Sequence, residues 1–264
     1  MLVSRTLREY RRSLIGWAIG ICAFFTMYLS IYPSIKASPD VYQGAALAKY
    51  PGALRDLMGG LNDFTSASGY LQTLVYQLFG PMLFVVCAML LGTRAIAQPE
   101  EAGTLELTVT LPIDRKNLVL QRFAGLMLAL LALCAVTLLV VWGVSVSADM
   151  GVGFDRILAG HTGVFLLAAL FGTLALTLGA ATGRRVVGMA AVGVLAVGGY
   201  IVETVGKNVD AISWLKWISP FHYYLDGQPI YNGFPWGDYL VLAGATIVLA
   251  LTAVLAFDRR DVGV

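Results

Sequence analysis

Charged residues are scarce in this chain. Of its 264 residues, 13% are Asp, Glu, Lys or Arg, whereas a soluble globular domain has about 25%. Apolar residues make up 58% of the sequence, and the mean hydropathy is +0.76. So little charge cannot cover a water-facing surface, but it can cover a lipid-facing one. The composition therefore excludes a soluble domain and the catalysis that such a domain performs.

Residues that bind metals or act as nucleophiles are also few. The two histidines, His161 and His222, cannot form a zinc site of the His-Glu-x-x-His type. The three cysteines, Cys22, Cys87 and Cys134, fall in apolar segments and match neither a disulfide framework nor a metal-ligand spacing. We expect no metal site, no catalytic residue and no cofactor in this chain, which is therefore not expected to be an enzyme.

A phosphate-binding loop is missing as well. Such a loop requires a glycine, four further residues and then Gly-Lys-Ser or Gly-Lys-Thr. The nearest approach is Gly206-Lys207-Asn208, but Ile201 stands where the first glycine should be and Asn208 replaces the hydroxyl residue. Any ATPase that drives this chain must therefore be a separate polypeptide.

Six long apolar segments are present instead. Each is long enough to cross a bilayer as a helix, which takes about 20 residues. Lipid cannot satisfy exposed backbone groups, and a β-barrel would need alternating segments of about ten residues. We therefore expect an all-α integral membrane protein, with residues 1–264 forming one transmembrane domain. The expected spans are Leu14–Tyr32, Leu71–Leu91, Leu118–Val141, Thr162–Ala181, Val186–Val205 and Tyr239–Phe257.

Lysine and arginine are distributed unequally between the two sides of these spans. With the N-terminus inside, twelve of them lie on the inner side and six on the outer side. Basic residues concentrate on the cytosolic side of membrane proteins. Both ends of the chain are therefore expected in the cytosol, and the net charge of +2 requires no nucleic-acid partner.

Two outer segments are expected to form short helices at the membrane surface. In the first, apolar residues recur at helical spacing until Gly59-Gly60. The second, residues 206–238, is too aromatic for a solvated loop and suits an interfacial or re-entrant pair of helices with a break at Pro220. The apolar residues of the first segment are Leu47, Tyr50, Leu54, Leu57, Met58 and Leu61.

Two polar residues near the outer boundary are candidates for the substrate path. Glu203 is the only carboxylate within the limits of an expected span, where a carboxylate can relay protons or contact a polar substrate. Lys207 follows at i+4, so an interfacial ion pair between them is the favoured interpretation. His222 could contact substrate or sense pH, but a packed interfacial histidine is the more common case.

Glycines spaced four residues apart predict close packing of the spans. Gly16 and Gly20 form one such pair, and Gly179 and Gly183 form another. The fifth span also contains several glycines. Small residues at this spacing let helix backbones approach closely in membranes.

The inner segment between the second and third spans, residues 94–117, is acidic at its start and apolar afterwards. Pro99 suits the first turn of a helix, where the helix dipole favours the negative charges of Glu100 and Glu101. The apolar residues that follow fit a helix or, by their alternation, a strand, and Pro112 ends either one. Too little of this chain is expected inside to cover such an element, so we expect a cytosolic partner.

This segment resembles the inner loop of ABC exporter permeases of the type-2 membrane family. The shared run is Pro99-Glu-Glu-Ala-Gly-Thr-Leu-Glu-Leu, followed by Leu111-Pro-Ile-Asp-Arg115. The stretch Ile218-Ser-Pro-Phe-His-Tyr-Tyr224 resembles the outer segment before the last span of that family. The basic N-terminal arm and Phe257-Asp-Arg-Arg-Asp261 are similar too, so the resemblance covers essentially the whole chain. One departure is Gln98-Pro99, where acidic residues often continue the cluster.

The resemblance implies a coupling helix that sits in a groove of a separate ABC ATP-binding subunit. Two copies of that subunit would bind ATP and Mg, and their closure would tilt the spans. It also implies an amphipathic connecting helix at residues 1–12, with Arg8, Arg11, Arg12 and Arg94 at the membrane edge. The implied coupling residues are Glu100, Glu101, Gly103, Thr104, Leu105, Glu106, Leu111 and Pro112.

The resemblance further implies an exporter that works as a dimer with a second copy or a paralogue. Uniformly apolar spans favour a hydrophobic or amphipathic cargo, such as a drug, an antibiotic, a lipid or a peptide. The Ala-, Gly-, Val- and Arg-rich composition indicates a bacterial plasma membrane. The alternative is an ATP-independent secondary carrier or channel, which should show inverted repeats and charges for ion coupling within the spans. We find no convincing repeat and no such charges.

Overall fold

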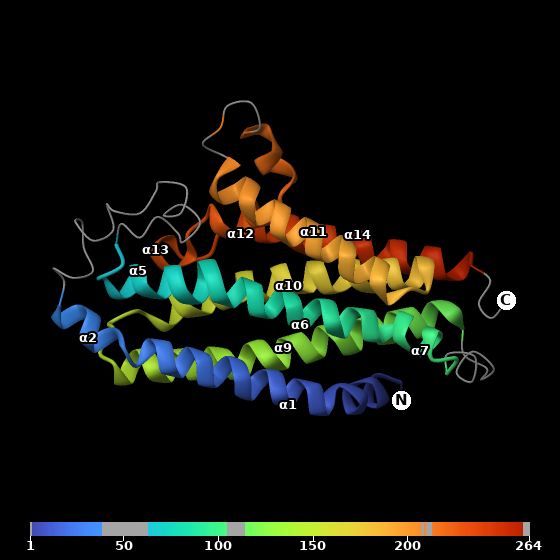
Figure 1. Cartoon of the computed structure of the whole chain (residues 1–264), viewed down its shortest axis with the longest axis horizontal. Coiled ribbons are helices and arrows are strands. Elements are labelled where there is room, and N and C mark those ends of the chain that lie inside the picture. The colour runs from blue at the N-terminus through green and yellow to red at the C-terminus, as the bar shows by residue number, and fades with distance from the viewer. Residues whose placement is uncertain (1, 39–62, 105–113, 207–208, 210–212, 261–264) are drawn as a thin grey trace.

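The computed structural model of the chain describes residues 2–38, 63–104, 114–206, 209 and 213–260, and all regular secondary structure in them is helical. Six helical segments are long and apolar enough to cross a membrane, which confirms the predicted number. They lie side by side, and both chain termini are at the same end of the bundle (Figure 1). The segments are α1 (Leu2–Leu29) followed by α2 (Tyr32–Ala37); α5 (Ala67–Leu71), the π-helix η2 (Gln72–Phe79) and α6 (Gly80–Ala95) in continuous succession; α9 (Arg115–Ser147); α10 (Phe154–Thr182); α11 (Arg185–Thr204); and α14 (Trp236–Asp258).

Several helices extend beyond the expected apolar limits. α10 begins at Phe154, ahead of the expected start at Thr162, and α9 begins at Arg115. At the start of α9, Asp114 caps the helix by accepting a hydrogen bond from the backbone of Lys116 at 3.4 Å. Hydropathy marks only the apolar part of a helix, whereas polar residues such as His161 are buried here by neighbouring helices.

α10 is the central helix of the bundle and packs against α6, α9, α11 and α14. Small residues allow this contact. A Cβ atom on Gly92 of α6 would lie 2.2 Å from the carbonyl oxygen of Gly172 on α10, and one on Gly172 would lie 3.2 Å from the Cβ of Ala88. The backbones of α6 and α10 therefore approach too closely for any larger residue at Gly92.

The glycine pairs that the sequence suggested behave differently from one another. Gly16 and Gly20 on α1 have open space around them within this chain, so the predicted packing role is wrong for contacts among the described residues. Gly179 does pack closely, with its Cα facing Ala97, and Gly183 ends α10. Spacing alone identifies small residues on one helix face but not whether another helix lies against that face.

The π-helix η2 lies directly before Gly80 and Pro81. A proline inside a helix lacks the backbone N–H and its ring collides with the preceding turn of an α-helix. The wider π-turn accommodates this mismatch within one continuous span. A Cβ on Gly80 would lie 1.9 Å from the carbonyl oxygen of Val75, so glycine is required where the two helix types meet.

The resemblance implied an amphipathic connecting helix at residues 1–12, and residues 2–12 are helical. They are the first turns of α1, which continues without a break to Leu29 (Figure 1). No proline or glycine lies between Leu2 and Ser13 to interrupt the helical hydrogen bonds. The arm and the first span therefore form one helix.

Short helices occupy the end of the bundle opposite the termini (Figure 1). The 3₁₀-helix η4 (Ser213–Ile218), α12 (Pro220–Leu225) and α13 (Pro229–Asn232) lie there. Ser219 is extended, with φ −74° and ψ 125°, so the segment breaks immediately before Pro220 as predicted. The amphipathic stretch expected at Leu47–Leu61 lies outside the described residues.

Candidate functional site

The inner segment contains a single helical turn, α7 (Ala97–Glu101), at the end of the bundle where the termini lie (Figure 1). Ile96, with φ −131° and ψ −53°, separates it from α6. The sequence predicted that the helix starts at Pro99. The turn starts at Ala97, two residues earlier. Ala97 is buried, and a Cβ on Gly179 of α10 would lie 3.2 Å from that of Ala97. This chain therefore supplies a surface for the start of the segment, because α7 packs on α6, α10 and α11. The apolar residues that were expected to need a partner, 105–111, lie outside the described residues.

Gly103 ends the turn in a left-handed conformation, with φ +67°. Its N–H donates to the carbonyl of Glu100 at 2.9 Å, and the N–H of Thr104 donates to the carbonyl of Pro99 at 2.9 Å. The Thr104 hydroxyl donates to the same carbonyl at 3.1 Å. Glycine adopts this backbone conformation without the steric cost that other residues incur.

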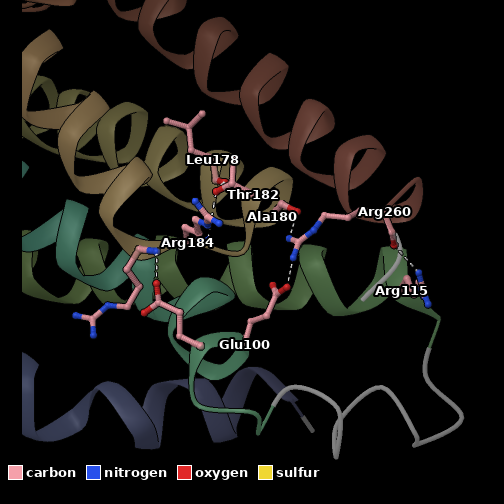
Figure 2. A network of polar contacts seen from close by, with 9 residues as sticks. Glu100, Arg115, Leu178, Ala180, Thr182, Arg184 and Arg260 are labelled. Carbon is pink, nitrogen blue, oxygen red and sulfur yellow. Dashed lines mark hydrogen bonds and ion pairs between the residues drawn. The ribbon is translucent and has the colours of Figure 1, made fainter. Parts of the chain in front are cut away.

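The carboxylate of Glu100 points into the chain rather than away from it (Figure 2). It forms an ion pair with Arg260, and the two side chains are only 17% and 23% exposed. Arg260 also donates to the carbonyl of Ala180 at 3.1 Å, and its own carbonyl accepts from Arg115 at 2.9 Å. Glu100 thus connects α7 to α9, α10 and the residues that follow α14.

Glu101 makes a second connection to the bundle. Its Oε1 accepts a hydrogen bond from the backbone N–H of Arg185, the first residue of α11, at 2.7 Å. The turn between α10 and α11 depends on Gly183, whose φ is +68°. A Cβ there would lie 2.4 Å from Nη2 of Arg260 and 2.5 Å from Oε1 of Glu100. A larger residue would be strained by this backbone conformation and would have to displace the ends of the two paired side chains.

The remaining expected coupling residues lie on the exposed side of the turn or beyond it. Glu101, Gly103 and Thr104 are exposed, together with Gln98 and Ala102. Four further coupling residues are outside the described residues: Leu105, Glu106, Leu111 and Pro112. The surface that α7 offers to another molecule is therefore residues 101–104 with Gln98, and not the carboxylate of Glu100.

The arginines expected at the membrane edge occupy two settings. Arg8, Arg11 and Arg12 are exposed on α1. Arg94, at the end of α6, lines a cavity beside α7. The same cavity is lined by Arg122 of α9, which is buried and ion-paired with Glu9 of α1 at 2.8 Å.

At the opposite end of the bundle, the structure brings Glu203 and His222 together. Nδ1 of His222 lies 3.2 Å from Oε2 of Glu203, and the side chains are 8% and 3% exposed. The Ser219 hydroxyl donates to the carbonyl of Gly199 at 2.9 Å, which fixes α12 against α11. The expected partner of Glu203, Lys207, lies outside the described residues, and among the described residues His222 contacts the carboxylate.

α12 is anchored on its other side by Tyr224, whose hydroxyl donates to the carbonyl of Tyr76. Burial raises the pKa of the Tyr224 hydroxyl well above 10, so it remains a neutral donor. The rings of Trp217 and Tyr223 lie 4.8 and 5.4 Å from that of His222. His222 is thus enclosed by aromatic rings and by one carboxylate.

One group of residues in the described part of the chain has the composition of a metal site. The ligand atoms of Glu203, His222 and the exposed Asp226 all lie within 4.8 Å of one another. Two carboxylates and an imidazole suit a divalent cation. The hydrogen bond between His222 and Glu203 already occupies two of these groups.

Sequence reasoning did not single out Arg260, Arg185, Gly183 or the pair of Glu9 and Arg122 as site residues. One signal was present: Arg122 lies inside the expected third span, where a charge requires a partner. The partner itself, 113 residues earlier in the chain, could not be read from local patterns.

The chain was compared with curated proteins and with models of protein families. A search of curated proteins found no match to the chain. The profile of the family described as ABC-2 family transporter protein matches residues 2–262, which is nearly the whole chain. Six membrane-spanning helices and an inner turn that follows the second span accompany that match. The chain therefore belongs to the ABC-2 family of transporter proteins and is a membrane permease of an ABC transporter.

Proposed function

We propose that this permease couples ATP hydrolysis on a separate ATP-binding subunit to the export of a hydrophobic or amphipathic substrate. The observation that supports the coupling role is the attachment of α7. Glu100 joins it to Arg260, Glu101 joins it to the start of α11, and Ala97 packs on α10. A force on this one turn would reach several spans together.

The ATP-binding subunit would contact the exposed side of the turn. Gln98, Ala102, Gly103 and Thr104 are accessible there, and the residues that follow Thr104 would extend the contact. Glu100 then acts as a positioning residue, because its carboxylate holds α7 on the bundle instead of touching the partner. Two ATP-binding subunits with ATP and Mg, and a second permease chain, would complete the transporter in a bacterial plasma membrane.

The proposed substrate class rests on the apolar side chains of the membrane-spanning helices. Large apolar side chains are exposed along α9, α11 and α14, and they would face lipid or a second permease chain. Two buried polar pairs lie close to the two ends of the described bundle, Glu9 with Arg122 at one end and Glu203 with His222 at the other. Such a middle region suits an apolar cargo, with Glu203 and His222 as candidate polar contacts at the outer end.

Cysteine crosslinking tests the partner contact. In a background with Cys22, Cys87 and Cys134 replaced by Ala, Thr104→Cys should crosslink to a co-expressed ATP-binding subunit. Asn232→Cys, exposed at the opposite end, should not. A Thr104→Cys variant that crosslinks no more than Asn232→Cys in an active complex would overturn the proposed contact.

Reconstituted transport tests the coupling to ATP. Proteoliposomes that contain the permease and its ATP-binding subunit should move an amphipathic dye only with hydrolysable ATP. A subunit whose phosphate-binding lysine is replaced should abolish that movement. Transport by the permease alone, without ATP, would instead support the alternative of a secondary carrier or channel.

A further inference from the structure

A cavity of about 280 Å³ lies between the N-terminal part of α1, the end of α6, the turn α7 and the start of α9. Binding sites for drug-sized ligands usually begin at about 300 Å³, so this volume suits a smaller group. The described residues that line it are Glu9, Tyr10, Arg94, Gln98, Pro99, Ala102, Thr104 and Arg122.

Two arginines and one carboxylate determine the charge of this cavity. Arg122 is 4% exposed, and one of its nitrogens, Nη1, bonds to Glu9 at 2.8 Å and to Thr6 at 3.3 Å. Its Nε is buried and has no hydrogen-bond partner among the described residues. A buried guanidinium N–H without a partner costs free energy that a bound anion would recover.

Arg94 provides a second, unneutralised positive charge. Its side chain lines the cavity, and no hydrogen bond or ion pair joins it to any residue in the described part of the chain. The carboxylate of Glu9 is already paired with Arg122. Among the described lining residues, the cavity therefore has an excess of one positive charge and free guanidinium donors, which match the oxygens of a phosphate group.

We propose that this cavity binds a phosphate group between Arg94 and Arg122. It lies at the end of the bundle where Arg8, Arg11 and Arg12 are exposed on α1, at the expected level of the inner lipid headgroups. Basic pockets between spanning helices on the cytoplasmic side bind anionic headgroups. The phosphate belongs either to an anionic lipid or to a free phosphate compound, and both offer the same oxygens.

Occupancy of the cavity stabilises the position of α7. Gln98 and Pro99 of α7 form one wall, while Glu9 of α1 and Arg122 of α9 form another. A phosphate group that contacts both arginines bridges α6 and α9 directly beside the turn. The site is thus a means by which membrane composition or phosphate concentration acts on α7, and it requires no ATP-binding subunit.

The test titrates the delipidated full chain in a neutral detergent and follows its melting temperature. The probes are dioleoylphosphatidylglycerol, dioleoylphosphatidylcholine and inorganic phosphate. We expect phosphatidylglycerol to raise the melting temperature saturably and phosphatidylcholine to have a much smaller effect. Arg94→Gln should raise the half-saturating concentration about tenfold or more. Arg184→Gln, an exposed arginine at the same end that does not line the cavity, should leave it unchanged.

Glu9→Gln separates anion binding from a folding defect, because it removes the negative charge and should lower the half-saturating concentration. A saturable effect of inorganic phosphate that Arg94→Gln removes would support the same site with free phosphate as its ligand. The proposal fails if neither phosphatidylglycerol nor phosphate raises the melting temperature. It also fails if Arg94→Gln and Arg184→Gln weaken binding equally, or if Glu9→Gln weakens it.

Discussion

The carboxylate of Glu100 on α7 is ion-paired with the guanidinium of Arg260, a residue 160 positions later in the chain. The same guanidinium donates to the carbonyl of Ala180, at the end of α10 (Figure 2). An inner turn that could have been a free loop is therefore attached to the bundle by a largely buried charge pair. Under the proposed coupling role, this attachment would pass a movement of the turn on to the spans.

Arg260→Gln should loosen α7. It removes a charged hydrogen bond from a partly buried carboxylate and should lower the free energy of unfolding by about 2 kcal/mol. Hydrogen exchange of the amides of residues 97–104 should also accelerate. Arg184→Gln, whose exposed side chain makes no hydrogen bond with the described residues, is the matched control. Unchanged exchange in Arg260→Gln would show that the pair does not hold the turn.

Gly183→Ala should be more harmful than either of two other glycine substitutions. The left-handed φ of +68° costs about 1–2 kcal/mol for an L-residue, and the new Cβ would also collide with Glu100 and Arg260. Gly103 has a similar φ, but nothing in the described part of the chain lies within 4 Å of the position that an added Cβ would take. Gly103→Ala should therefore cost only the free energy of the left-handed backbone conformation. Gly193→Ala lies within α11 with nothing nearby and should be neutral or stabilising. The melting temperatures of the three variants rank their stabilities. Equal melting temperatures for Gly183→Ala and Gly103→Ala would show that the added Cβ does not collide with the ion pair.

Gly92→Ala should force α6 and α10 apart. The added Cβ would lie 2.2 Å from the carbonyl oxygen of Gly172, and overpacking of this kind costs about 1–3 kcal/mol. Gly16→Ala, which has open space within the chain, serves as the control. Denaturation in mixed micelles measures the free energy of unfolding of both variants. A stable Gly92→Ala variant would mean that the two helices separate easily.

His222→Ala should destabilise the outer end of the bundle. It removes the hydrogen bond between the imidazole and the carboxylate of Glu203, which is 3% exposed, and losing a hydrogen bond to a charged group costs about 2 kcal/mol. His222→Gln keeps a donor and should cost less. Because the Trp217 ring lies 4.8 Å from His222, its fluorescence in a single-tryptophan background reports the local change. Ile218→Ala, at a position that is 70% exposed, should have little effect on either readout.

The number of spans, the position of both termini at one end and the break before Pro220 follow from local properties of the sequence. A long apolar run must form a helix in lipid because its backbone groups have no other partner. Pro220 restricts Ser219 to an extended conformation wherever the segment lies. The start of the inner turn was also predictable from Pro99 and the acidic residues after it, but its end was not: the sequence placed the end at Pro112, whereas α7 ends at Glu101, before the left-handed Gly103.

The choice of partners was decided only by the tertiary structure. Glu100 could have faced solvent, another subunit or any inner arginine, and it meets Arg260 because α10 and α14 end beside α7. Packing likewise distinguishes Gly92, which lies against α10, from Gly16, which faces no helix in the described part of the chain. Hydropathy and propensity act over a few residues, whereas ion pairs and close backbone contacts depend on where distant helices end. For that reason the sequence by itself determined the membrane topology, and the arrangement of the helices determined the site.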